Sequence, residues 1–121
     1  MIIVDTSSWI DHFRGRSTPL ADILGTRQEA LHPFVFGELL LNGLPRKGGL
    51  NADLLKLRTV PVASPAEVAA FIGWAELTGT GVGYVDAHLL VSAKMLPGGR
   101  LLTEDLKLRA QAERLGLAFA P

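Results

Sequence analysis

The sequence predicts an α/β fold in which helices flank a mainly parallel central sheet. Two observations indicate this class. Short apolar segments alternate with helix-like segments along the chain, as in strand–helix–strand units. The apolar run at 1–4 and the segment 100–103, with its two central leucines, are each followed closely by an aspartate and then by helical sequence, as buried parallel strands are. Because 121 residues suffice for one core, we expect a single domain over residues 1–121.

The predicted strands are short, apolar and bounded by turn-forming or charged residues, which is the usual pattern of buried strands. They cover residues 1–4, 60–62, 100–103 and 117–119. A further apolar stretch lies near residues 30–31. The order of elements therefore favours a parallel sheet whose strands are joined by helices.

The predicted helices have recognisable starts and ends. Ser7 or Ser8 caps the first one, Pro33 suits the first turn of another, and residues 64–67 combine a cap, a proline and an acid. Gly116 ends the last one. The predicted helices cover residues 7–14, 20–24, 33–41, 50–57, 65–75, 84–95 and 105–115.

Composition limits the possible functions. The chain has no cysteine, which excludes disulfides, cysteine-bound zinc and a thiol nucleophile. Twelve basic residues balance twelve acidic ones, so charge alone does not hold this protein on nucleic acid. With 48% hydrophobic residues it is rather apolar, and we expect a homodimer. No secretion signal and no apolar run of about 18 residues is present, so we expect a cytoplasmic protein without membrane association.

Two aspartates follow predicted strands. Asp5 comes directly after residues 1–4, and Asp105 comes soon after residues 100–103. Open α/β sheets bind their ligands beyond the carboxyl ends of such strands. Each acid has a structural alternative, because an aspartate at this position also caps a helix or interacts with its dipole.

Two further acids lie in apolar helices. Leucines follow Glu38 at the next three positions and Phe34 lies one turn before it, so we expect Glu38 to have almost no solvent-exposed face. Asp86 stands in line with the apolar Leu89 and Leu90. Burying an ionised carboxylate costs several kcal/mol (order of magnitude) unless a partner or metal compensates for it. A core salt bridge for Glu38 and a helix cap for Asp86 are the structural alternatives.

Taken together, the four carboxylates predict a metal site. Carboxylates that lie close together do not all ionise without a compensating cation. Divalent ions such as Mg²⁺ prefer oxygen ligands, and a bound ion can activate water and stabilise a phosphodiester during cleavage. Setting these four acids aside leaves four more basic than acidic residues, which is compatible with a basic rim around an acidic pocket.

Four short motifs resemble those of PIN-domain ribonucleases, specifically the VapC-type toxins of VapBC toxin–antitoxin systems. The matching segments are 3–10 (IVDTSSWI), 37–39 (GEL), 85–89 (VDAHL) and 102–105 (LTED). They occur in the family's order and cover nearly the whole chain.

The resemblance implies a PIN-like α/β/α sandwich and an Mg²⁺ or Mn²⁺ site. The implied metal ligands and catalytic residues are Asp5, Glu38, Asp86 and Asp105. Small polar residues beside the metal are implied at Thr6, Ser7 and Thr103. The implied activity is endonucleolytic cleavage of RNA, inhibited by a cognate VapB-type antitoxin.

Two alternatives remain open. A receiver-like, Mg²⁺-binding signalling domain has a similar length and element order, but it needs a second acid near the first strand and a late lysine at a strand end. A PIN nuclease with a role in RNA processing and no toxicity shares the same chemistry, and gene context would distinguish it. A phosphatase of the haloacid dehalogenase type is disfavoured, because Ser7 occupies the place of its second acid.

Overall fold

The computed structural model describes residues 1–44 and 58–120, which contain four strands and six helices. The strands are β1 (Ile2–Val4), β2 (Glu29–Leu31), β3 (Arg58–Thr59) and β4 (Arg100–Leu102). The helices are α1 (Thr6–Phe13), α2 (Leu20–Ile23), α3 (Pro33–Leu41), α5 (Pro65–Trp74), α6 (Tyr84–Met95) and α7 (Leu106–Arg114).

The strands form one parallel sheet in the order β3-β2-β1-β4. β1 is a central strand that pairs with both β2 and β4, and all three of its residues are buried. Its uninterrupted apolar sequence reflects this position, since such a strand has no solvent-exposed face. Because all strands run in the same direction, their carboxyl ends share one edge of the sheet.

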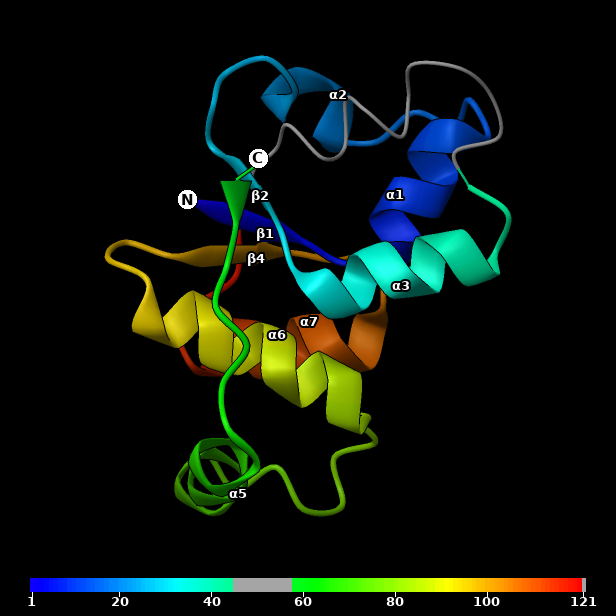
Figure 1. The fold of residues 1–121 in the computed structure, drawn as a ribbon. Coiled ribbons are helices and arrows are strands. Elements are labelled where there is room, and N and C mark those ends of the chain that lie inside the picture. The colour runs from blue at the N-terminus through cyan, green and yellow to red at the C-terminus, as the bar shows by residue number, and fades with distance from the viewer. Residues whose placement is uncertain (45–57, 121) are drawn as a thin grey trace.

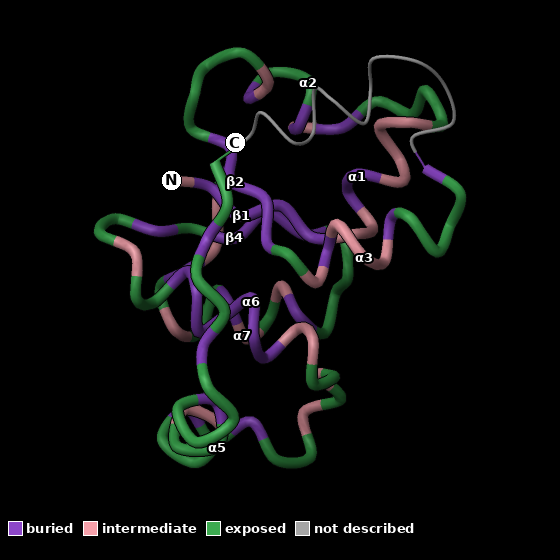
Figure 2. The backbone as a smooth tube through the Cα atoms, in the orientation of Figure 1, coloured by how far each residue is buried: buried purple, intermediate pink, exposed green. Residues whose placement is uncertain are grey.

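Helices cover both faces of the sheet (Figure 1). α6 packs on β1 and β4, and α5 packs on the outside of α6. α2 lies on the opposite side, and α1 contacts both α2 and α3. The predicted α/β/α sandwich with a parallel sheet is therefore confirmed. Figure 2 shows that buried residues concentrate in β1, β2, β4 and α6, whereas β3 and most of α5 are exposed. In the described residues, no helix is both long and apolar enough to cross a membrane.

Helix prediction was accurate where capping signals were strong. α5 begins with a complete capping box: the Ser64 hydroxyl accepts from the Glu67 backbone N–H, and the Glu67 carboxylate accepts from the Ser64 backbone N–H. The bounds of α3 and α6 match the prediction. The prediction for the first helix cap was wrong, because Asp5 occupies that position in place of Ser7 or Ser8. The helix predicted at 50–57 lies outside the described residues.

Strand prediction was less accurate. The apolar stretch near residues 30–31 belongs to β2, which pairs with β1. The strand predicted at 60–62 was wrong, because the residues that pair with β2 are Arg58 and Thr59. Pro61, two residues later, has no backbone N–H to donate to the sheet. The strand predicted at 117–119 is only an isolated bridge between Ala118 and Leu101.

Candidate active site

Asp5 lies at the carboxyl end of β1 and is buried, with 4% of its surface exposed. Its carboxylate accepts hydrogen bonds from the Ser7 hydroxyl at 2.7 Å and from the Ser8 backbone N–H at 3.1 Å, so it caps α1. Burial raises the pKa of Asp5, while hydrogen bonds from Thr103, Ser7 and Ser8 act in the opposite direction. The buried position of the Asp5 carboxylate thus disfavours its ionised form, and the hydrogen bonds that it accepts partly compensate for this.

Thr103 connects the ends of β1 and β4. Its hydroxyl donates a hydrogen bond to Oδ2 of Asp5 and accepts one from the backbone N–H of Asp105 at 3.0 Å. The Asp105 carboxylate in turn accepts from the Leu108 backbone N–H at 3.0 Å, so Asp105 caps α7. Asp5 and Asp105 therefore both cap helices, which was the structural alternative to a role in a site. Both also lie at the edge of the sheet where the site was predicted.

Glu38 comes from α3 and is joined to α1. The Thr6 hydroxyl donates a hydrogen bond of 2.7 Å to Oε1 of Glu38. Because Thr6 directly follows Asp5, this bond brings the third predicted acid toward the end of β1. The prediction that Glu38 has almost no exposed face was wrong: it is half-buried, and Leu40 and Leu41 are 49% and 89% exposed. Of the three leucines that follow Glu38, only Leu39 is therefore buried, and the other two lie on the surface of α3.

Asp86 shows the strongest electrostatic effect of the four acids. It is half-buried in the first turn of α6. Burial and, after it, the negative charges of Asp5, Asp105 and Glu38 together raise its pKa to about 6. A hydrogen bond from the backbone of Gly83 lowers it. The other three predicted acids thus lie close enough to influence Asp86, although the four come from separate parts of the chain.

The acids are gathered but not arranged as a finished ligand shell. In residues 1–44 and 58–120, no group of three or more histidine, aspartate or glutamate side chains has the geometry of a metal site. Hydrogen bonds from Thr6, Ser7 and Thr103 already occupy oxygens of Asp5 and Glu38. Asp105 is exposed, whereas Asp5 is buried. The cluster is therefore an oxygen-rich edge of the sheet to which several separate elements contribute carboxylates.

Two other residues lie beside the acids, and neither was predicted. Tyr84 stands two positions before Asp86, and Lys107 stands two positions after Asp105. The side chain of Lys107 lies against Gly81, in the loop before α6. In the sequence, only their nearness to predicted site acids could have indicated that these two residues lie close to the site.

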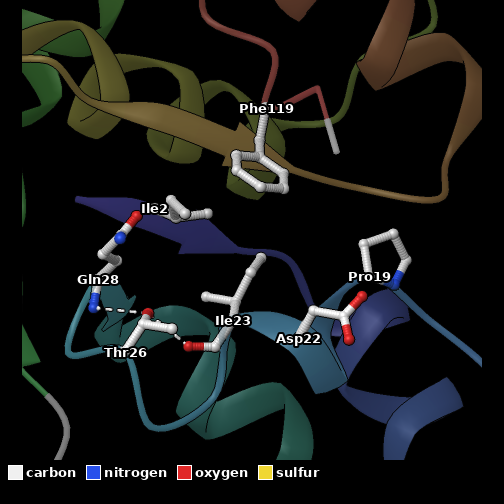
Figure 3. A pocket seen from close by; sticks show the side chains of 7 residues that line it. All are labelled: Ile2, Pro19, Asp22, Ile23, Thr26, Gln28 and Phe119. Carbon is white, nitrogen blue, oxygen red and sulfur yellow. Dashed lines mark hydrogen bonds between the residues drawn. The ribbon is translucent and has the colours of Figure 1, made fainter.

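A cavity of about 280 Å³ lies away from the acids. Figure 3 shows Phe119 facing Ile23 across the end of β1 at Ile2, with Thr26 and Gln28 at the side. Ile2 begins β1 and Gln28 directly precedes β2. This cavity is therefore at the amino edge of the sheet, opposite the edge at which parallel α/β sheets place their active sites.

No protein-family profile matches this chain. Among curated proteins, Ribonuclease VapC32 from two strains of Mycobacterium tuberculosis (CDC 1551 / Oshkosh and ATCC 25618 / H37Rv) is 38% identical over 120 residues. That alignment covers 99% of this chain and 97% of the relative.

Two solved structures share the fold. FitAcB from Neisseria gonorrhoeae has a TM-score of 0.70 at 22% identity, over 93% of this chain and 94% of that one. PAE2754 from Pyrobaculum aerophilum has a TM-score of 0.67 at 16% identity, over 98% of this chain and 87% of that one. These likenesses support the PIN-like α/β/α fold. Because the identity to VapC32 extends over almost its entire length, the chain belongs to the VapC family of PIN-domain ribonucleases.

Proposed function

We propose that this protein is a metal-dependent endoribonuclease that acts as the toxin of a toxin–antitoxin pair. Residues 1–121 form its single PIN domain, and Asp5, Glu38, Asp86 and Asp105 are its catalytic metal ligands. The name of the related VapC32 supports ribonuclease activity. The observation that carries the assignment of the site is the raised pKa of Asp86, which three other carboxylates from separate elements help to produce.

The donor set suits Mg²⁺ or Mn²⁺. All four proposed ligands supply carboxylate oxygens, which these hard cations prefer, and Mg²⁺ binds through only one or two carboxylates together with water and substrate phosphate. Such an ion supplies an activated water molecule and neutralises charge on the phosphodiester. The mutual repulsion that raises the pKa of Asp86 also means that a divalent cation would stabilise the cluster.

The chain's own residues prepare this site by positioning. Thr103 and Ser7 hold the carboxylate of Asp5, and Thr6 holds that of Glu38. These bonds fix two acids before an ion arrives, which reduces the reorganisation required for binding. Thr6, Ser7 and Thr103 are therefore supporting residues. Above its pKa of about 6, Asp86 is ionised and able to bind a cation.

The proposed partners are RNA as substrate, a cognate VapB-type antitoxin as inhibitor, and a second copy of the chain. Large apolar side chains on the surface support the proposed protein partners. Single exposed apolar side chains are common on any protein, but adjacent ones favour an interface. Leu40 and Leu41 are adjacent at the end of α3, and Trp74 and Met95 are also exposed. We place the protein in the cytoplasm. Family membership argues against the receiver-like alternative.

The test is cleavage of total cellular RNA by purified protein with Mg²⁺, Mn²⁺ or EDTA. We expect metal-dependent cutting, and a loss larger than roughly 100-fold in Asp5→Asn and Asp86→Asn, because losing even an outer partner of a metal site commonly costs 10–100-fold. Asp22→Asn is the matched control, since Asp22 lines the cavity at the opposite edge. Equal cutting by all variants would indicate a contaminating nuclease and contradict the proposed site.

A toxin role is tested separately from the chemistry. Expression of the wild-type chain should arrest growth, and co-expression of an antitoxin encoded beside it should restore growth. Asp86→Asn should not arrest growth. Metal-dependent cleavage without growth arrest would favour a nuclease in RNA processing.

A further inference from the structure

A second cavity, of about 260 Å³, lies beside the acidic cluster. Its walls include the apolar side chains of Ile72, Leu77 and Val82, the backbone of Gly81 and Gly83, and the ring of Tyr84. It is smaller than the roughly 300–1,000 Å³ of pockets that enclose whole drug-sized ligands. Its size therefore suits one ring system of a larger molecule.

The cavity adjoins Asp86 through its own wall. A Cβ atom on Gly83 would lie 3.9 Å from Oδ2 of Asp86, so that carboxylate rests against the backbone of the wall. Tyr84 and Ala87, which also line the cavity, precede and follow Asp86 in α6. The cavity therefore adjoins the segment of backbone against which the Asp86 carboxylate lies.

The loop that forms the cavity is ordered by its own hydrogen bonds. The Thr80 hydroxyl donates to the Leu77 carbonyl at 2.7 Å and accepts from the Val82 backbone N–H at 3.4 Å. Gly79 and Gly81 have φ values of +78° and +85°, which favour glycine. The loop's shape is therefore set by contacts within the loop, and its exposed glycines leave the backbone accessible.

Tyr84 is the aromatic residue among those that line the cavity. Its side of α6 is open, with 55% of the residue exposed. One neighbour orients the ring: His88 lies 4.8 Å away, centroid to centroid, at an interplanar angle of 83°. Exposed aromatic rings beside a nucleic-acid path commonly stack on unpaired bases.

A cation lies on the other side of the loop. An ideal Cβ on Gly81 would come within 2.8 Å of the Lys107 Cδ and 3.3 Å of its Nζ, so the lysine side chain lies along the glycine backbone. Lys107 is exposed and is the second residue of α7, shortly after Asp105. The Asp86 carboxylate thus lies near one wall residue of the cavity, Gly83, and the Lys107 side chain lies near another, Gly81.

We propose that this cavity binds one nucleobase of a single-stranded RNA next to the cleaved phosphodiester, with Tyr84 stacking on the base and Lys107 meeting a neighbouring phosphate. This inference rests on the proposed ribonuclease function and adds a reason for selectivity between RNAs. Single-stranded RNA fits better than a duplex, because a base can enter a cavity only when it is unpaired and unstacked.

The inference is tested by binding, using the Asp86→Asn protein so that no RNA is cut. The probes are short fluorescent single-stranded RNAs and an abasic ribose-phosphate chain of the same length, followed by fluorescence anisotropy. We expect the base-containing RNAs to bind more tightly than the abasic chain. Adding Tyr84→Ala should reduce this preference by roughly 5- to 150-fold, the range for loss of one base–aromatic stack, whereas Tyr84→Phe should keep it.

Three further variants separate the parts of the proposal. Trp74→Ala removes an exposed aromatic ring outside the cavity and should leave the preference unchanged. Thr78→Leu enlarges a side chain that lines the cavity and should reduce the preference. Lys107→Gln should weaken binding of base-containing and abasic chains alike and lower the salt dependence of binding by about one charge, as expected for a phosphate contact. Thermal unfolding verifies that each variant is folded.

Several outcomes would overturn the inference. They are an unchanged preference in Tyr84→Ala, an equal loss in Tyr84→Phe and Tyr84→Ala, or no RNA binding at all by a folded Asp86→Asn protein. None of these decides the ribonuclease function, which is measured by metal-dependent cleavage with the wild-type chain. A wild-type protein that cuts RNA while Tyr84→Ala binds normally would contradict only the base site.

Discussion

The hydroxyl of Thr103 donates a hydrogen bond to Oδ2 of Asp5, although 98 positions separate the two residues in the sequence. The bond joins the ends of two neighbouring parallel strands, β1 and β4. It also holds a buried carboxylate whose pKa burial raises and this hydrogen bond lowers. Thr103 therefore stabilises the ionised form of Asp5 and fixes its orientation.

We predict that Thr103→Val destabilises the protein by roughly 1–3 kcal/mol, because it leaves a buried carboxylate oxygen without its donor. Valine keeps the shape of threonine, so little of this loss arises from packing. Thr103→Ser restores the hydroxyl and should recover most of the free energy of unfolding. Urea unfolding measures all three proteins. Equal stability of the valine variant and the wild type would mean that this hydrogen bond makes no net contribution to the free energy of unfolding.

A second prediction concerns Asp86, whose pKa of about 6 is above the ordinary value of 3.8. Between these values the folded state binds more protons than the unfolded state, so stability falls as pH rises through that window and then remains constant. Asp86→Asn removes the repulsion. Without metal it should be more stable than the wild type above pH 6, by roughly 1 kcal/mol after allowing for solvent screening of a half-exposed group.

The measurement is the difference in unfolding free energy between Asp86→Asn and the wild type, from pH 4 to pH 8 in EDTA. The difference should increase with pH and level off above about pH 6. Asp22→Asn is again the control. A constant difference for Asp86→Asn would show that neither burial nor the other three acids raise the pKa of Asp86 in the folded protein.

The sequence was sufficient to predict the α/β class, several of the helices and the two aspartates that follow β1 and β4. β1 and the first turn of α5 are specified locally: one by an uninterrupted apolar run, the other by a cap, a proline and an acid. The four acids were candidates because strand ends and apolar helices are unusual places for carboxylates. Their mutual proximity was an expectation, and the raised pKa of Asp86 now supports it.

Other features depend on contacts between distant residues, and local patterns do not predict these. β2 is recognisable only through its pairing with β1, since Glu29 and Ala30 have no strong strand signal. The exposure of Leu40 and Leu41 depends on which face of α3 meets α1. The position of Lys107 against Gly81 likewise requires the tertiary fold.

His32 provides a third prediction, with a pH dependence opposite to that of Asp86. It caps α3 through Nδ1, which accepts from the Phe34 backbone N–H at 3.0 Å. Burial, together with the nearby His88, lowers its pKa to about 4. The unfolded state therefore binds more protons between pH 6.5 and 4, and stability is lost as pH falls through this range.

His32→Asn should retain the cap, because asparagine is among the best helix caps, and should flatten this loss on acidification. The decrease will not vanish, since burial also lowers the pKa of His88. The windows of His32 and Asp86 overlap with opposite signs, so the wild type hides both effects and single variants reveal them. His12→Asn, a change in a half-buried histidine of α1, is the comparison; if it gave the same flattening, the assignment to His32 would be wrong.

The last prediction separates the two roles of Asp5, which caps α1 and is a proposed metal ligand. Asp5→Asn keeps a side-chain oxygen for the Ser8 backbone N–H and removes a buried charge, so its stability without metal should stay within about 1 kcal/mol of the wild type. Asp5→Ala loses the cap and should cost roughly 0.5–2 kcal/mol, and more if the Thr103 hydroxyl finds no new acceptor.

Divalent metal distinguishes the second role. At 100 times its dissociation constant, a cation that binds only the folded state adds about 2.7 kcal/mol to the wild type. Both Asp5 variants should lose most of this gain, although only the alanine variant loses the cap. Thermal unfolding with Mg²⁺, Mn²⁺ or EDTA measures it. If Asp5→Asn kept the full metal effect, Asp5 would be a structural cap and the ion would be held by the remaining acids, because asparagine keeps an oxygen for the Ser8 backbone N–H but removes the charge and the second carboxylate oxygen.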